Sequence, residues 1–483
     1  MTRRQALLMA ALLLALVKCV EFAADSQALF FHDSGAFFLN GLRLAFVSFR
    51  SWTYGDLICA FALPFHSLRA IVALQMFLGG LTAWLLTFAL VRFLGIRPWI
   101  GILAGLAFAI DPVQVLYEHM VMTEATAVLA MAAFLVVALE YQRRPWLPWL
   151  AILSFLGIVL VSLRTVYLPV VLAAAVLLPL GVLFPSSRRR TRLLALALAV
   201  SCGSTLLFHV GYRRMTGHIA RREPGYNYWS GFFLLATVTP IIEPGDSDDP
   251  RVADAVAAQS RSSVPLVFGT RTDHLWNPGG LAPRLIAIFG GDQRQADQAA
   301  QRLAHAAIRR NPCGFIGLGL DTWLAYWQGI PNLRWSEEWE NGMKPPHVVN
   351  ANDAGVILSR FGADVSNQGE WLTFSRRYEL RARYWFVFLL LAPFLSGVAW
   401  WLAPRNSEGP ALLFVWSCML LAATCLGASD SPYRYLHPFS FTGLAGIAIL
   451  CEKAFGSRHN PRLSCRSASD PRGRQSALQP EHP

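Results

Sequence analysis

The sequence is poor in charged residues, which excludes most classes of soluble protein. Only 15% of its 483 residues are Asp, Glu, Lys or Arg, whereas a soluble globular chain carries about 25%. Lysine is especially scarce, and nearly all basic residues are arginine. The net charge of +12 comes from basic residues in short loops and in the C-terminal tail, where they fit anionic lipid headgroups. We therefore expect the lipid bilayer as a partner and no nucleic acid.

Closely paired cysteines are also missing. The eight cysteines are scattered and form no Cys-x-x-Cys motif. Most of them lie inside apolar runs, namely Cys19, Cys202, Cys418, Cys425 and Cys451. This distribution favours neither a disulfide framework nor a zinc site.

The sequence is instead rich in long apolar runs. Hydrophobic residues make up 54% of the chain and the mean hydropathy is +0.40. A membrane helix needs about 20 mostly apolar residues, so the sequence predicts an all-α membrane protein with about ten transmembrane helices. The first resembles a signal peptide, but its run continues past Lys18 to Ala24, so we expect an uncleaved anchor. The expected spans lie near residues 5–24, 70–91, 99–116, 120–139, 146–162, 165–184, 193–211, 385–403, 410–428 and 434–452.

The arginines predict a topology with both termini in the cytoplasm. With the N-terminus inside, the short inner loops and the tail hold most arginines, and the short outer loops hold acids, as the positive-inside rule requires. Interfacial helices are expected in the first outer loop, an interfacial or re-entrant helix over 315–327, and a surface helix over Gln293–Arg310. The expected regions are a seven-span module over 1–211, an outward-facing soluble or interfacial segment over 212–384, three spans over 385–452, and a basic, disordered tail over 453–483.

Asp33 is the first candidate for chemistry. It lies in Phe31-His32-Asp33-Ser34-Gly35, directly after the first expected span. A carboxylate beside the bilayer is a functional candidate, because it can act as a general base toward an attacking hydroxyl or amine. The alternative is that Asp33 caps a short interfacial helix, since Asp is a favoured N-cap residue.

The second outer loop gathers three acids and a histidine, namely Asp111, Glu118, His119 and Glu124. They could support the site, contact an acceptor, or bind a divalent cation through oxygen ligands. Their spacing is not a defined metal signature, so no metal site is assigned. Asp111-Pro112 is also a stop signal for a helix, and Glu124 suits a helix N-terminus.

Arg164 and Arg434 run against the positive-inside bias, because both lie where the outer ends of spans are expected. The arginine fork is suited to phosphate. Tyr433, Tyr435 and His437 flank Arg434, and this setting favours phosphate recognition there. A salt bridge, for instance to Asp430, or snorkelling to the headgroups is the structural alternative.

Three motifs resemble those of the GT-C superfamily, the integral-membrane glycosyltransferases that use polyprenyl-phosphate sugars. They are the first-loop aspartate in His32-Asp33-Ser34-Gly35, the run from Phe108-Ala109-Ile110-Asp111-Pro112 through Tyr117-Glu118 to Thr123-Glu124, and the turn Arg434-Tyr435-Leu436-His437-Pro438. The branch that the chain most resembles is the protein O-mannosyltransferase and lipid A aminoarabinose transferase type. The resemblance covers residues 5–211 well, the last three spans loosely and 212–384 hardly at all. Ser34 follows Asp33 where many relatives have a second acid.

The resemblance implies an inverting hexosyl- or pentosyltransferase at the outer face of a bacterial cytoplasmic membrane. The donor would be a polyprenyl-phosphate-linked sugar, and the acceptor a lipid, polysaccharide or protein of the cell envelope. Asp33 would deprotonate the acceptor, and Arg434 with Arg164 would stabilise the leaving phosphate. Two other classes stay open, a transporter or flippase of lipid-linked sugars and a non-catalytic envelope-assembly protein. A flippase would be expected to show broken helices or charges near the membrane midplane, whereas the expected spans look unbroken.

Overall fold

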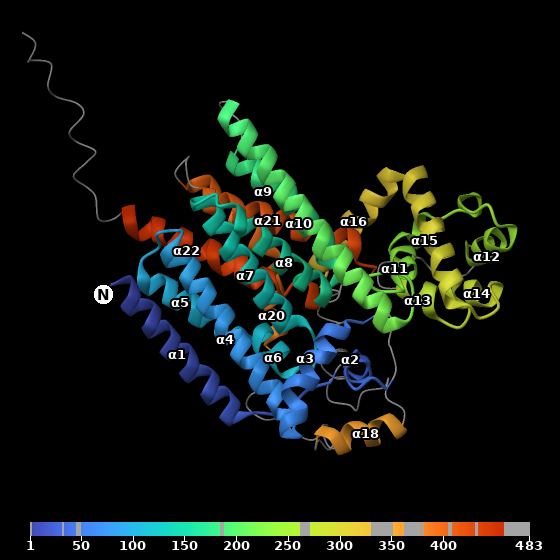
Figure 1. The fold of residues 1–483 in the computed structure, drawn as a ribbon, viewed down its shortest axis with the longest axis horizontal. Coiled ribbons are helices and arrows are strands. Elements are labelled where there is room, and N and C mark those ends of the chain that lie inside the picture. Colours follow the sequence, from blue (N-terminus) through green and yellow to red (C-terminus); the bar gives the residue numbers. More distant parts are fainter. Residues whose placement is uncertain are drawn as a thin grey trace, which may run out of the picture.

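The computed structural model describes residues 2–30, 33–44, 50–183, 188–260, 271–329, 351–361, 378, 381–403, 408–429 and 433–457. Over these residues the fold is all-helical, and the β pairing is limited to an isolated bridge between Leu29 and Met120. Figure 1 shows a large helical bundle and a smaller helical group beside it.

Most of the long helices form the bundle, and their apolar side chains share one core. α4 lies near its centre, since it packs against α1, α5 and α7; α8 packs against α7 and α10, and α20 against α21 and α22. The helices of the bundle are α1 (Arg3–Ala24), α4 (Arg69–Arg92), α5 (Pro98–Ala109), α6 (Pro112–His119), α7 (Glu124–Arg143), α8 (Leu147–Leu163), α9 (Leu168–Leu183), α10 (Arg188–Ala220), α20 (Ala382–Leu402), α21 (Glu408–Gly427) and α22 (Phe439–Ser457).

Every expected span overlaps a helix of the bundle, but fewer helices meet the length and composition criteria for crossing a membrane. Within the described ranges six helices do so, or seven if the bent pair of α5 and α6 counts as one span. α8 and α9 are apolar but shorter, and α10 continues past the expected end at residue 211 to Ala220. Apolar helices of this number and length indicate an all-α membrane protein.

The expectation of an unbroken span over 99–116 is wrong. The chain bends by 48° between α5 and α6, because Pro112 lacks an amide hydrogen and disfavours a helical conformation at the residue before it. Asp111 adopts φ −56° and ψ 122°, and its side chain accepts a hydrogen bond from the Val113 amide at 2.8 Å, so it caps the new helix.

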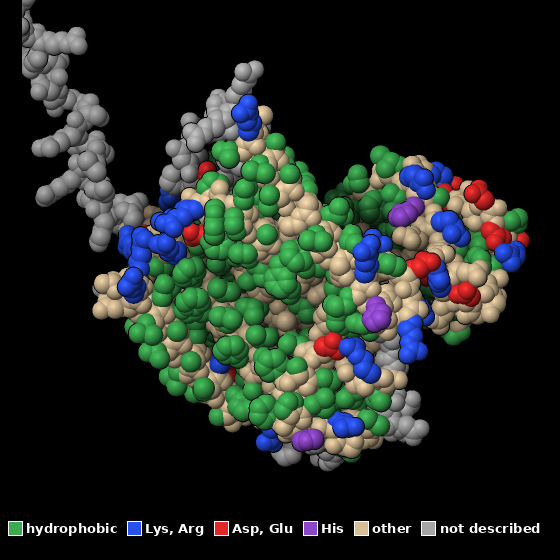
Figure 2. All heavy atoms as spheres, in the orientation of Figure 1, with side chains coloured by type: hydrophobic (Ala, Val, Ile, Leu, Met, Phe, Trp, Pro, Cys, Tyr) green, Lys and Arg blue, Asp and Glu red, His purple; other side chains and the backbone are tan. Residues whose placement is uncertain are grey.

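The surface of the bundle is apolar where it would face lipid. Leu8, Leu12, Leu16 and Val20 of α1 are each at least 60% exposed, and such a row is costly in water but not in hydrocarbon. Figure 2 shows hydrophobic side chains over the middle of the bundle, with Lys and Arg gathered near the N-terminus and mixed charges over the smaller helical group.

We call the smaller group the small lobe and define it as residues 229–310 without 261–270. It has its own apolar core and contains α11 (Ser230–Val238), α12 (Pro250–Ser260), α13 (Arg271–Trp276), α14 (Leu281–Ile288) and α15 (Gln293–Arg310). The alanine-rich face of α15 packs against α11. The contact depends on Gly231, since a Cβ atom there would lie 2.0 Å from the Asp297 carbonyl oxygen. The prediction of a helix over Gln293–Arg310 is confirmed.

Shorter helices connect these parts. α2 (Ser34–Gly41) and α3 (Trp52–Ala62) pack against each other in the first loop, and α16 (Pro312–Trp327) packs against α21. α18 (Ala351–Phe361) contacts the turn η1 (Leu63–Phe65). The remaining turns are η2 (Thr165–Tyr167), η3 (Thr239–Ile241), η4 (Pro244–Asp246) and η5 (Tyr433–Tyr435). The expectation of a disordered tail over 453–483 is wrong at its start, because α22 continues to Ser457; the rest of that tail lies outside the described residues.

Candidate functional site

A cavity of about 1470 Å³ lies between the small lobe and the end of the bundle that carries the first-loop helices. It brings together Asp33, Glu124, Arg164 and Arg434 from four separate elements. The sequence predicts all four as site residues, and the structure adds Arg50 beside them. Part of the lining is apolar and includes Leu168, Met419 and Leu426, and another part belongs to the small lobe.

Asp33 lies between two arginines. Its Oδ1 is 2.5 Å from Nη2 of Arg50, and its Oδ2 is 2.9 Å from Nη1 of Arg434. All three side chains are largely buried, with exposed fractions of 12%, 22% and 16% for Asp33, Arg50 and Arg434. Asp33 does stand at the N-cap position of α2, but its side chain makes no capping hydrogen bond. The carboxylate is therefore used for ion pairing.

The arginines also govern the protonation of Asp33. Burial by itself would raise the pKa of this carboxyl, because the charged form loses its hydration. The charges and hydrogen bonds of Arg50 and Arg434 outweigh burial and hold the pKa of Asp33 well below its usual range. Asp33 is thus a carboxylate at any physiological pH, and it remains a weak base for as long as both arginines hold it.

Arg164 and Glu124 form a second ion pair in the cavity. Nη1 of Arg164 is 2.6 Å from Oε1 of Glu124, and the Glu124 side chain is only 1% exposed. Glu124 is the first residue of α7, and Arg164 follows the last turn of α8. Tyr435 joins the two pairs, because its ring centroid lies 4.8 Å from Cζ of Arg164 and 5.6 Å from Cζ of Arg434.

Arg50 is the residue that sequence reasoning missed. It directly precedes Ser51, whose hydroxyl caps α3 by accepting from the Tyr54 amide, so the start of α3 fixes its position. Its guanidinium carbon lies 6.0 Å from the centroid of Phe233 in the small lobe. A usable signal was present, since an arginine in a loop that is expected to lie outside opposes the positive-inside bias in the same way as Arg164 and Arg434.

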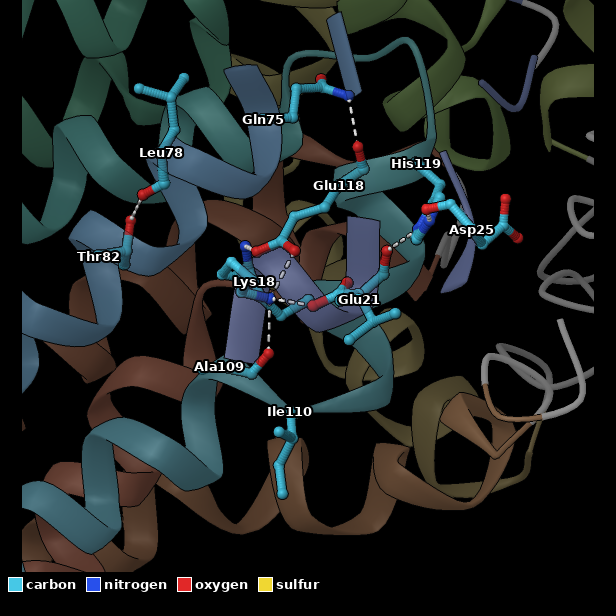
Figure 3. Close-up of polar contacts among 12 residues, drawn as sticks. Lys18, Glu21, Asp25, Gln75, Leu78, Thr82, Ala109, Ile110, Glu118 and His119 are labelled. Atoms are coloured by element: carbon cyan, nitrogen blue, oxygen red, sulfur yellow. Dashed lines mark hydrogen bonds and ion pairs between the residues drawn. The ribbon is translucent and has the colours of Figure 1, made fainter. Parts of the chain in front are cut away.

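The other predicted acids lie elsewhere in the bundle (Figure 3). Glu118 is fully buried, and its Oε2 is 2.6 Å from Nζ of Lys18. Lys18 also contacts Glu21 at 2.8 Å and donates to the Ala109 carbonyl oxygen at 2.7 Å. The cluster therefore ties the end of α1 to the bend between α5 and α6. Glu118 is not among the residues that line the cavity.

Asp111 and His119 also serve the bend. Besides capping α6, Asp111 accepts a hydrogen bond from the Ser440 hydroxyl of α22. His119 is buried with its Nδ1 2.9 Å from the Val115 carbonyl oxygen and its Nε2 3.3 Å from that of Asp25. The four residues predicted as one supporting set thus divide into Glu124, which lines the cavity, and Asp111, Glu118 and His119, which do not.

Across the described ranges, no three His, Cys, Asp or Glu side chains are grouped so that they could hold a metal ion. Positive charge in the cavity comes from guanidinium groups. Asp430, the alternative partner of Arg434, lies outside the described residues, and Arg434 forms an ion pair with Asp33.

The small lobe supplies a polar and aromatic wall. Asp297 of α15 accepts a hydrogen bond from the Phe232 amide at 2.9 Å, and burial raises the pKa of its carboxyl to about 6. Gln298 and Gln301 lie on the same helix and also line the cavity. Trp229 and Trp276 stack with their ring centroids 5.0 Å apart.

The cavity therefore combines two paired carboxylates, a group of arginines, apolar side chains, amides and aromatic rings. Comparison with known proteins assigns no relative, since no protein-family model, curated protein or solved structure matches this chain.

Proposed function

We propose that this protein is an inverting glycosyltransferase that moves a sugar from a polyprenyl-phosphate donor to a cell-envelope acceptor. The observation that carries this proposal is the convergence of Asp33 with Arg50, Arg164 and Arg434 in one large cavity at the end of an apolar bundle. A carboxylate, a group of arginines and access from the lipid are the three features that such a reaction needs.

The arginines and the apolar wall suit the donor. Guanidinium groups recognise phosphate through forked hydrogen bonds, and Arg50, Arg164 and Arg434 provide three of them in one cavity. Leu168, Met419 and Leu426 line the same cavity, so a prenyl chain can follow the bundle while its phosphate reaches the arginines. A water-soluble nucleotide sugar would have no use for such a wall.

The small lobe suits the acceptor. Gln298, Gln301 and Asp297 offer hydrogen-bonding groups, and Trp229 with Trp276 offers ring faces. Pockets that combine aromatic walls with a few convergent polar groups are typical of small-molecule recognition. In this proposal the lobe holds a lipid, polysaccharide or protein acceptor against the sugar of the donor.

The chemistry is a single displacement at the anomeric carbon. Asp33 takes the proton of the acceptor hydroxyl or amine while that atom forms a bond to the sugar. The bond between the sugar and the donor phosphate breaks, its electron pair stays on the phosphate, and the arginines stabilise the added charge. One displacement inverts the anomeric centre.

The proposed topology has about ten spans, both termini in the cytoplasm and the cavity facing outward from a bacterial inner membrane. The arginine distribution supports it. Single-cysteine labelling in a cysteine-free variant tests it. An impermeant thiol reagent should label Asp254→Cys of the small lobe in intact cells and leave Arg143→Cys at the end of α7 unlabelled. The reverse pattern would overturn the orientation.

A flippase for lipid-linked sugars is the second candidate, and one observation favours it. The bent pair of α5 and α6 and the buried contact between Lys18 and Glu118 resemble the broken helices and buried charges of transporters. A flippase would move the donor between leaflets and leave its bond to the sugar intact.

The decisive test is sugar transfer by the purified full-length protein in proteoliposomes. Mass spectrometry of envelope glycans first identifies the sugar that is missing from a deletion strain. The donor in the assay is the polyprenyl phosphate that carries this sugar. Asp33→Asn should lower the transfer rate by about 10²–10⁴-fold. Asp56→Asn is the matched control, because Asp56 pairs with Arg43 on the surface and does not line the cavity. Movement of the donor without release of prenyl phosphate would establish the flippase instead.

A further inference from the structure

Asp33 forms ion pairs with the two arginines that the donor phosphate would need. Each of its carboxylate oxygens faces a different arginine, Arg50 at 2.5 Å and Arg434 at 2.9 Å. A phosphate that binds to these two arginines must compete with Asp33, because both anions seek the same N–H donors. The proposed base and the proposed leaving group are therefore linked through shared partners.

The charges of the cavity fit such an exchange. Asp33 and Glu124 oppose Arg50, Arg164 and Arg434, which leaves one net positive charge in this part of the cavity. A lipid phosphodiester carries one negative charge and balances it. When the sugar leaves, the phosphate gains a second negative charge, and a further positive charge must become available to it.

Proton uptake by Asp33 makes that charge available. Once Asp33 carries the acceptor proton it is neutral, and its attraction for the arginines largely disappears. We propose that Asp33 and the donor phosphate are alternative partners of Arg50 and Arg434, and that both arginines pass from the carboxylate to the phosphate as the sugar is transferred. This inference rests on the proposed function and adds Arg50 as a catalytic residue that contacts the phosphate.

In this step the bond to the sugar changes from the phosphate to the acceptor, and one proton moves to Asp33. The acceptor oxygen or nitrogen gives its proton to Asp33 and its electron pair to the anomeric carbon. The bond between that carbon and the phosphate oxygen breaks, and the phosphate keeps the electron pair. Arg50 and Arg434 then pair with the phosphate monoester, and Asp33 returns its proton to water when the product leaves.

The exchange also resolves a conflict in the site. Two arginines hold the pKa of Asp33 well below its usual range, which makes the carboxylate a poor proton acceptor. A bound donor phosphate that shares the two arginines weakens their hold on Asp33, so the basicity of Asp33 rises only when the donor is in place, and proton uptake then completes the exchange. Donor binding thereby prepares the base.

Binding of a short-chain prenyl monophosphate to the full-length protein in detergent tests the exchange. Asp33→Asn removes the competing charge and should tighten binding by about tenfold, since more of the protein offers unoccupied arginines. Arg50→Gln should weaken binding by about tenfold, because charge-assisted hydrogen bonds are lost. In the double variant the gain from Asp33→Asn should shrink, because the two residues act on each other. Asp56→Asn should bind as the wild type does.

The pH profile of transfer provides a readout that leaves Asp33 in place. In Arg50→Gln one arginine is gone, so the pKa of Asp33 rises and the fall in rate on the acid side should move up by about one unit or more.

The outcomes separate the two proposals. Unchanged or weaker prenyl phosphate binding by Asp33→Asn, with transfer intact in the wild type, would overturn the exchange and leave the glycosyltransferase standing. An unshifted pH profile in Arg50→Gln would do the same even if Asp33→Asn fails to fold. Absence of both transfer and prenyl phosphate binding in the wild type would overturn both proposals.

Discussion

Lys18 of α1 and Glu118 of α6 meet at 2.6 Å across a hundred residues of sequence, and both side chains are buried. Gln114 supports the pair by donating to the other Glu118 oxygen at 2.6 Å. The contact lies where the chain bends between α5 and α6. The ion pair therefore holds α1 against the bend between α5 and α6.

Removing one partner of this pair should destabilise the protein strongly. Lys18→Met leaves the buried Glu118 carboxyl without its cation and should lower the free energy of unfolding by about 3–5 kcal/mol. Glu118→Gln should cost less, because Lys18 keeps Glu21 as a partner at 2.8 Å. The double variant should be less harmful than the sum of the two. Thermal unfolding in detergent measures this, and additive effects would mean that the two groups do not interact.

Gly79 of α4 should be as sensitive as the pair itself. A Cβ atom at this position would lie 1.6 Å from Oε1 of Glu118, so Gly79→Ala forces the carboxylate away from Lys18 and Gln114. Gly80 is the matched control, because its Cβ would lie 3.4 Å from the Lys18 side chain. Gly79→Ala should lower the unfolding temperature clearly and Gly80→Ala little. Equal effects would mean that contact with Glu118 does not set the sensitivity of Gly79, since both substitutions change helix propensity alike.

The sequence predicted helices better than it predicted contacts. Apolar runs of membrane length located every helix of the bundle, and the period and stop signal of α15 gave its bounds. The apolar run over 99–116 does not predict the bend at Asp111-Pro112, because a proline near the end of an apolar run also fits a simple helix end.

Proximity along the chain misled the prediction of the site. Glu118 and Glu124 are close in sequence, yet Glu118 pairs with Lys18 and Glu124 with Arg164. Such partners are chosen by tertiary packing, which local patterns do not encode. The outward position expected for Asp33, Arg164 and Arg434 did indicate three residues that line one cavity.

Asp297 should make the small lobe less stable at neutral pH than at acidic pH. Burial raises the pKa of its carboxyl from 3.8 to about 6, so the folded protein binds this proton more tightly than the unfolded chain. The contribution of Asp297 to stability is therefore greatest below about pH 4, falls as the pH rises to about 6 and stays low above it. Asp297→Asn should remove this dependence.

Hydrogen exchange of the full-length protein checks this in peptides from α11 and α15, after correction for intrinsic rates. Asp292→Asn is the matched control, because Asp292 is the N-cap residue of the same helix. The amides of Gln295 and Arg294 lower the pKa of Asp292, so its contribution has the opposite sign and is lost as the pH falls. Equal pH dependence in the wild type and in Asp297→Asn would remove Asp297 as the source.

Substitution of Arg434 distinguishes two roles for its side chain, recognition of the donor phosphate and neutralisation of the Asp33 charge. The side chain pairs with Asp33 at 2.9 Å and lies near the ring of Tyr435. Lysine keeps the charge but loses the planar fork and the stacking. If Arg434 binds the donor phosphate, Arg434→Lys should raise KM for the donor and lower kcat/KM by about 10–100-fold, which corresponds to about 1.4–2.8 kcal/mol of transition-state stabilisation.

The control is Arg43→Lys, since Arg43 pairs with Asp56 at 2.8 Å and lies outside the large cavity. That substitution should leave the donor dependence unchanged, because a point charge suffices for a half-exposed pair. The measurement is the rate of transfer against donor concentration in detergent for both variants. If Arg434→Lys behaves as Arg43→Lys does, the guanidinium of Arg434 serves only to balance Asp33. Leaving-group stabilisation would then pass to Arg164 and Arg50, and the glycosyltransferase proposal would lose its principal phosphate ligand.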